Sequence, residues 1–168
     1  MKVLLDENLI QDEISKIAGS LNLRHSGDPT SVVMVGILNG CFMFYSDLVK
    51  KLDFKIECDF IRVKSYLGKN KQGDIQITKD LETPIKGKHI YLIDDILDSG
   101  NTMKAVIDYL TVKKPSQIGI ITLLSRKNKT IDNYHLYSGF ELDNEWVIGM
   151  GMNDDKGFNR NLPNIYSI

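Results

Sequence analysis

The sequence predicts an α/β fold: a Rossmann-like central parallel sheet flanked by helices, with a small hood formed by the N- and C-terminal segments. Continuous β-branched apolar runs are typical of strands buried on both faces of a parallel sheet. These runs alternate with segments whose apolar residues recur at helical spacing. The 168 residues suit one domain with a single core. We expect a single domain, 1–168, with its core at about 25–135 and its hood at about 1–20 and 136–168.

The first expected element is a helix over about 7–20. Its apolar residues follow helical spacing, Asp6 is a suitable N-cap, and Gly19 lies near the expected end. A turn at 27–30 then leads into the continuous apolar strand 32–38.

The rest of the chain continues this alternation. In chain order we expect a helix over about 42–52, a strand at 58–63, a polar loop at 65–74, a short strand at 75–78, a buried strand at 89–95, a helix over about 102–110, a strand at 117–125 and a short strand near 146–149. Ligands of such sheets bind beyond the carboxyl ends of the strands. The residues that follow each apolar run are therefore the candidates for a site.

Composition excludes several classes of protein. Lys plus Arg number 21 against 22 Asp plus Glu, so the net charge of -1 gives no overall reason to bind nucleic acid or an anionic membrane. No stretch of about 18 apolar residues predicts a membrane span, and the N-terminus lacks the form of a signal peptide. Cys41 and Cys58 form no CxxC pair and are expected as thiols. We expect a cytoplasmic protein.

The strongest signal lies where the buried strand 89–95 gives way to a helix. Asp94 and Asp95 stand together at the end of this strand. Burying two acids is costly unless cations or hydroxyl donors accompany them. Ribose hydroxyls and Mg²⁺, which prefers few carboxylates plus substrate oxygens, would satisfy both.

A loop of small polar residues, 98–102, follows the two acids. At a helix N-terminus, free backbone N–H groups and the helix dipole form an anion site. Ser99 and Thr102 add hydroxyl donors, and Gly100 allows close approach of the backbone. The loop lacks the Walker lysine, which disfavours a P-loop NTPase. An ordinary helix capped by Ser99 is the alternative, but three acids in five residues after an apolar strand fit it poorly.

The stretch 93–102 resembles the phosphoribosyl-pyrophosphate (PRPP) signature of the type I phosphoribosyltransferases. In that signature, two acids and two hydrophobic residues precede Asp, Thr or Ser, Gly, a variable residue and Thr. The resemblance implies that Asp94 and Asp95 hold the ribose hydroxyls and Mg²⁺. It also implies a loop for the 5′-phosphate, made of Asp98, Ser99, Gly100, Asn101 and Thr102.

Four further segments are similar to the hypoxanthine-guanine phosphoribosyltransferase family, so that the resemblance covers about 9–165. Residues 36–44 resemble its first active-site loop, in which the family has a non-proline cis peptide. Residues 59–66 resemble a strand and its lid, 145–151 resemble the base-binding segment, and 160–163 match a closing Arg-Asn-Leu-Pro. The implied contacts are Leu38, Asn39, Gly40 and Arg160 at pyrophosphate, Ser65 and Tyr66 in the lid, and Arg126, Trp146 and Val147 at the purine.

Several positions depart from the family's usual residues. Asn39 replaces a Lys beside pyrophosphate, where Arg160 or a lid lysine compensates. Asn101 replaces a frequent Lys in the phosphate loop, whose backbone donors suffice without it. Arg126 stands where a Lys usually donates to the purine's 6-oxo group, and its planar fork differs from an ammonium.

A metal-contacting Asp of the family aligns with either of two residues here. Counting forward places Asn153 at this position, and counting back from Arg160 places Asp154 there. Charge favours Asp154 as the third metal residue beside Asp94 and Asp95, because Mg²⁺ gains more from a carboxylate.

The resemblance implies transfer of phosphoribose from PRPP to a 6-oxopurine, with Mg²⁺ as cofactor. Asp98 is the expected general base, acting on a proton at N7 of the base. A homodimer or homotetramer is expected, and the ranking of hypoxanthine, guanine and xanthine stays open. The alternative is a nucleotide-sensing, RNA-binding regulator with the same fold, which would need a basic surface that the net charge of -1 does not suggest.

Overall fold

The computed structural model describes residues 1–65 and 75–168, which form two sheets and three helices. The helices are α1 (Glu7–Arg24), α2 (Phe42–Val49) and α3 (Asn101–Thr111). The strands are β1 (Lys2–Leu5), β2 (Val32–Leu38), β3 (Ile56–Ser65), β4 (Ile75–Lys79), β5 (His89–Leu97), β6 (Gln117–Arg126), β7 (His135–Leu142), β8 (Val147–Ile148) and β9 (Ile165–Ser167).

The larger sheet has the order β4-β3-β2-β5-β6-β7 within the described residues. Neighbouring strands from β3 to β7 pair in parallel, and only β4 pairs antiparallel, at the edge of the sheet. β2 lies in the middle, with Val32 opposite both Ile56 and His89. The predicted parallel α/β architecture is confirmed.

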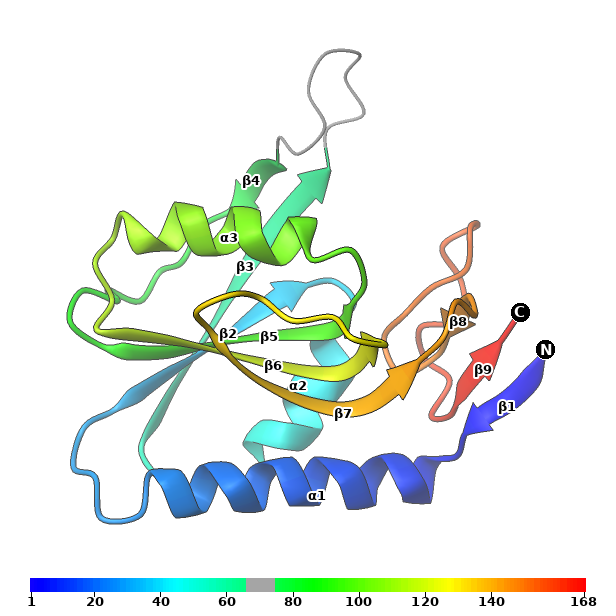
Figure 1. Ribbon diagram of the computed structural model, residues 1–168, viewed down its shortest axis with the longest axis horizontal. Coiled ribbons are helices and arrows are strands. Elements are labelled where there is room, and N and C mark those ends of the chain that lie inside the picture. Colours follow the sequence, from blue (N-terminus) through cyan, green and yellow to red (C-terminus); the bar gives the residue numbers. More distant parts are fainter. Residues whose placement is uncertain (66–74) are drawn as a thin grey trace.

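The helices cover both faces of this sheet (Figure 1). α1 and α2 pack on one face, where Ile14 and Phe44 belong to the same buried cluster. α3 packs on the other face through Met103 and Val106. This two-sided cover explains why β2 is buried along nearly its whole length. In the described part of the chain, no helix combines the length and apolar character needed to cross a membrane.

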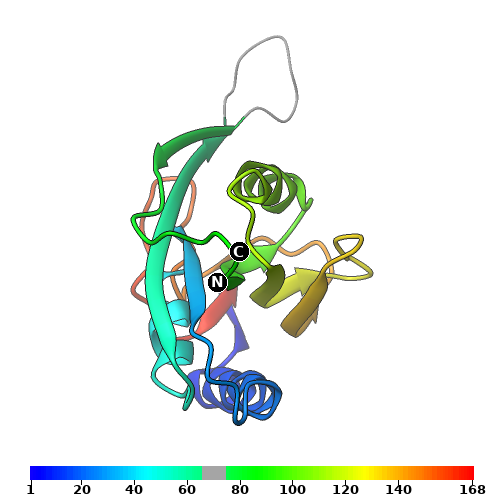
Figure 2. The same cartoon turned by 90° about the vertical axis from the view of Figure 1, so that its left-hand side faces the viewer.

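The smaller sheet joins the two ends of the chain. Its order is β1-β9-β8, and both pairings are antiparallel. Because β1 pairs with β9, the N- and C-termini lie close together, as two views of the molecule show (Figures 1 and 2). This sheet corresponds to part of the expected hood.

The structure corrects several expected elements. β7 joins the larger sheet although the segment from about 136 onward was expected in the hood, so the sheet extends past the predicted boundary. The first helix was expected to end near Ser20 and instead continues to Arg24, because fully buried Leu21 prolongs its apolar face beyond Gly19. The predicted N-cap is confirmed, since the Asp6 carboxylate accepts from the Leu9 N–H at 2.9 Å.

The second helix was expected to reach about residue 52 and instead ends at Val49. The side chain of Asn22 explains this end. It donates to the carbonyl of Lys51 at 3.0 Å and accepts from the N–H of Asp53 at 3.1 Å. The carbonyl of Lys51 and the N–H of Asp53 thus have hydrogen-bond partners without a further helical turn.

Candidate active site

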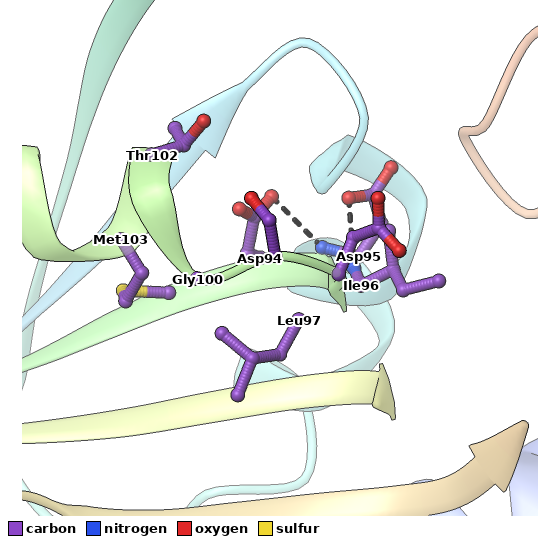
Figure 3. Close-up of a pocket in the computed structure, with 9 residues that line it drawn as sticks. Asp94, Asp95, Ile96, Leu97, Gly100, Thr102 and Met103 are labelled. Atoms are coloured by element: carbon purple, nitrogen blue, oxygen red, sulfur yellow. Dashed lines mark hydrogen bonds between the residues drawn. The ribbon is translucent and has the colours of Figure 1, made fainter. Parts of the chain in front are cut away.

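The carboxylates of Asp94 and Asp95 lie near the carboxyl end of β5 and line one pocket with Thr102 of α3 (Figure 3). This pocket has a volume of about 260 Å³. Its lining also includes Asp98, Ser99 and Gly100. The strand end and the phosphate loop that the sequence predicts as one site therefore share one cavity.

The carboxylate pair is only partly satisfied by the protein. Asp94 accepts the backbone N–H of Asp95 at 3.0 Å, and Asp95 accepts that of Ile96 at 2.8 Å. Burial raises the pKa of Asp94 well above its ordinary value, and the adjacent charge of Asp95 raises it further. Burial also raises the pKa of Asp95, while the charge of Arg160 acts in the opposite direction. A pair in this state favours the approach of a cation or of hydroxyl donors.

The loop before α3 lines the same pocket through Asp98, Ser99 and Gly100. Gly100 is the N-cap of α3, with φ of 84°, a left-handed conformation that suits glycine. Ser99 Oγ accepts the N–H of Asn101 at 3.2 Å. Asn101 begins the helix with an exposed side chain, and Thr102 lines the pocket. The first turn of an 11-residue helix thus borders the cavity through Thr102 and Met103, a place where an anion can bind.

The loop after β2 borders the carboxylate pair. The bond between Leu38 and Asn39 is a non-proline cis peptide, as the family resemblance implies. Gly40 packs so tightly that an added Cβ would overlap the carboxylate of Asp95. Asn39 is exposed, and its carbonyl accepts the N–H of Phe42 at 3.3 Å.

The hood meets this loop through Gly151. A Cβ at Gly151, where φ is 99°, would overlap the carbonyl of Gly40. Arg160 Nη1 donates to the carbonyl of Gly151 at 2.6 Å. This contact holds Arg160 beside the loop where the sequence predicts pyrophosphate.

A second pocket, of about 180 Å³, opens beside the first. Arg126, Trp146 and Val147, the three predicted purine contacts, all line it. Trp146 is 61% exposed and Val147 is buried. Asp95 and Asp98 line both this pocket and the first one, which places the two cavities side by side.

Arg126 is already engaged in this pocket. Its Nε donates to Asp98 Oδ1 at 2.8 Å. Its Nη1 donates to the carbonyls of Asp143 at 2.8 Å and Glu145 at 2.9 Å. The sequence indicates none of these contacts, because residues 28, 17 and 19 positions apart have no local pattern that links them.

The structure separates the two candidates for the third metal residue. The Asp154 carboxylate accepts from the N–H groups of Lys156 and Phe158 and from Asn159 Nδ2, so it is used within its own loop. Asn153 lines the second pocket instead. No group of three or more Asp, Glu, His or Cys in the described residues is arranged to hold a metal. The expected grouping of Asp154 with Asp94 and Asp95 is therefore not formed.

The sequence analysis also missed residues around these cavities. Met152 in the second pocket and Met103 in the first supply apolar walls that no motif marks. Gly151 has a recognisable signal in the sequence, because 149–151 is a Gly-Met-Gly run. Both glycines adopt positive φ, and Gly151 is the one that lies against Gly40. Of the predicted lid, Ser65 ends β3, whereas Tyr66 lies outside the described residues.

Known proteins share this sequence and this architecture. A family model described as a phosphoribosyl transferase domain matches residues 2–155. The chain is 36% identical over 170 residues to a hypoxanthine-guanine phosphoribosyltransferase of Aquifex aeolicus, a match that covers 100% of this chain and 94% of that protein. It is 38% identical over 166 residues to the enzyme of the same name from Staphylococcus aureus, covering 98% and 91% of the two chains.

A solved structure leads to the same conclusion. The hypoxanthine phosphoribosyltransferase of Staphylococcus aureus superimposes with a TM-score of 0.90 at 37% identity, covering 100% of this chain and 91% of that one. Sequence and three-dimensional structure agree over the full length of the chain. The protein therefore belongs to the phosphoribosyltransferase family, in its hypoxanthine-guanine branch.

Proposed function

We propose that the protein transfers the phosphoribosyl group of PRPP to a 6-oxopurine, forming a nucleoside monophosphate and pyrophosphate. The arrangement of the two adjoining pockets carries this proposal. One combines a carboxylate pair with a helix N-terminus, and the other combines Arg126 with an exposed Trp146. Asp98, which lines both pockets as Asp95 does, stands where the sugar and the base would meet.

The first pocket suits the activated sugar. The N–H groups at the start of α3 and the hydroxyl of Thr102 would bind the 5′-phosphate, while Asp94 and Asp95 would accept the ribose hydroxyls. The raised pKa values of these two acids indicate a place for a cation, which fits Mg²⁺ held by few carboxylates plus substrate oxygens. When bound, Mg²⁺ would neutralise the charge that builds on the departing pyrophosphate.

The chain's own residues would carry the rest of the reaction. Gly40 and Arg160 would face pyrophosphate, and departure of this group leaves positive charge on C1 of the sugar. As N9 of the base forms the new bond to C1, Asp98 would take the proton from N7. The bound base would be stacked on Trp146, with its 6-oxo group accepting from Arg126 and its edge donating to the carbonyl of Val147.

Supplying each purine separately tests the activity. With Mg²⁺ and PRPP, hypoxanthine or guanine should yield the corresponding nucleoside monophosphate and an equal amount of pyrophosphate, measured by chromatography. Adenine should react poorly, since its 6-amino group leaves the arginine donor unpaired. Pyrophosphate release that does not depend on any 6-oxopurine would contradict the proposal.

The setting of this enzyme is part of the same proposal. Unpaired Cys41 and Cys58 suit a reducing cytoplasm. A single domain assembled as a homodimer or homotetramer rests on the family resemblance, and analytical ultracentrifugation tests it. The comparisons give no support to the RNA-binding alternative, and a filter-binding assay with RNA should find no specific complex.

A further inference from the structure

We infer that Arg126 is a positioning residue for Asp98, in addition to its expected contact with the base. Its guanidinium joins three segments that are distant in sequence: the phosphate loop, the end of β6, and the link between β7 and β8 at 143–145. This inference rests on the proposed function, because it concerns the acid that handles the purine's proton.

The two partners of the ion pair differ in how firmly the protein holds them. The Asp98 side chain is 66% exposed and belongs to a loop, whereas that of Arg126 is 16% exposed at the end of a buried strand. The two carbonyl contacts fix the plane of the guanidinium, so the Nε–H points at Asp98 in one defined direction. An exposed ion pair adds little stability. Its consequence here is orientation of the carboxylate.

The donor count of arginine supports a division of labour. A guanidinium has five N–H donors. Nε–H serves Asp98, and the two N–H groups of Nη1 serve the carbonyls of Asp143 and Glu145. Within 1–65 and 75–168, no acceptor pairs with the two N–H groups of Nη2, which can donate to the 6-oxo group of the base. Arg126 thereby aligns both Asp98, which accepts the proton, and the purine that releases it.

Lysine cannot reproduce this arrangement at position 126. Its donors all sit on one nitrogen, while the contacts of Arg126 use two separate nitrogens facing different segments. A lysine that reaches the 6-oxo group would release Asp98 and the carbonyls at 143–145. Arg126→Lys should therefore preserve much of base binding and lower kcat by about 10- to 100-fold, as small misplacements of a reacting group do.

A double-mutant cycle distinguishes positioning from simple base contact. Arg126→Lys, Asp98→Asn and the double variant are compared with the wild type for kcat and for KM of hypoxanthine. If Arg126 acts through Asp98, the lysine substitution lowers kcat in the wild type and changes it little in the Asp98→Asn background. Equal falls in both backgrounds, or a change confined to KM, would overturn the inference.

Chemical rescue provides a second measurement that does not depend on lysine. Arg126→Ala should regain kcat when guanidinium is added and should not respond to methylammonium, because only a planar fork replaces the lost donors. Equal rescue by both cations would count against positioning. Circular dichroism melting of each variant identifies any loss of folding before the kinetics are compared.

Lys16→Gln is the control for loss of an exposed ion pair. Lys16 pairs with Glu13 at 2.8 Å within α1, and its side chain is 71% exposed. Neither residue lines the sugar pocket or the purine pocket, so near wild-type kcat is expected. A wild-type protein that transfers no phosphoribose would overturn the proposed function itself. If the wild type is active but the effects of the two substitutions on kcat are additive, only the positioning role of Arg126 is overturned.

Discussion

Asp98 lines both pockets and pairs with Arg126 at 2.8 Å. It therefore connects the sugar pocket with the purine pocket. Asp98→Asn keeps the shape and removes the proton acceptor. We expect kcat to fall by about 10²-fold or more. Steady-state rates with saturating PRPP and hypoxanthine measure this effect. Asp108→Asn on the exposed face of α3 is the isosteric control, and a near-normal rate for Asp98→Asn would remove the proposed role.

Gly40 shows how a residue without a side chain can define a site. An added Cβ would overlap the Asp95 carboxylate, so Gly40→Ala must displace either the acid or the loop. We expect KM for PRPP to rise by about tenfold or more, because the displaced carboxylate belongs to the sugar pocket. Gly19→Ala in α1 is the control, since a Cβ there has nothing within 4 Å. An unchanged KM in Gly40→Ala would show that the loop adapts freely.

His89 makes stability depend on pH. Burial lowers the pKa of His89 to about 4, against 6.5 for an ordinary histidine. Between pH 6.5 and 4, His89 is protonated in the unfolded chain but stays neutral in the folded protein. The free energy of unfolding therefore falls as the pH drops from 6.5 towards 4. The slope from this one group is at most about 1.4 kcal/mol per pH unit.

Urea titrations at several pH values measure this contribution. His89→Gln should unfold with a shallower pH dependence than the wild type between pH 6.5 and 4. His135→Gln, at an exposed position, is the matched control. Parallel curves for the wild type and His89→Gln would mean that His89 does not carry the effect.

At the scale of elements, the sequence pattern predicts helices and strands whose residues are buried in a regular way along their whole length. β2, β5 and β6 read as continuous apolar runs because helices cover both faces of the sheet. β7 escaped prediction because it lies at the edge of the sheet and mixes half-buried polar and apolar residues. In the smaller sheet, the short strand expected near 146–149 is confirmed as β8. β1 and β9 have four and three residues, too few to show a period, and were not predicted.

At the scale of the whole molecule, the site depends on contacts that join distant parts of the chain. The motif at 94–102 was predictable because one strand-to-helix junction contains it. The approach of Gly151 to Gly40 and the pairing of Arg126 with Asp98 arise from the packing of separate elements. The sequence therefore identified most residues that line the pockets. Which of these residues contact one another could be read only from the three-dimensional structure.

The smaller sheet positions the base-binding segment through the C-terminus. Val147 lies opposite Ser167 and Ile148 opposite Tyr166, and the N–H of Ile168 donates to the carbonyl of Trp146 at 3.0 Å. Deleting 166–168 removes these contacts but retains fully buried Ile165 in the core. We therefore expect the larger sheet to stay folded while Trp146 and Val147 lose their support.

The deletion should raise KM for hypoxanthine by about tenfold or more and change KM for PRPP much less, because the sugar pocket lies at the end of β5. Steady-state kinetics with each substrate varied in turn measure the two constants. Ile168→Ala keeps the backbone donor to Trp146 and should resemble the wild type. If the deletion variant binds hypoxanthine normally, the pairing between β8 and β9 is not what holds the purine pocket. If both constants rise together, the smaller sheet supports the whole site, and the two pockets are mechanically one.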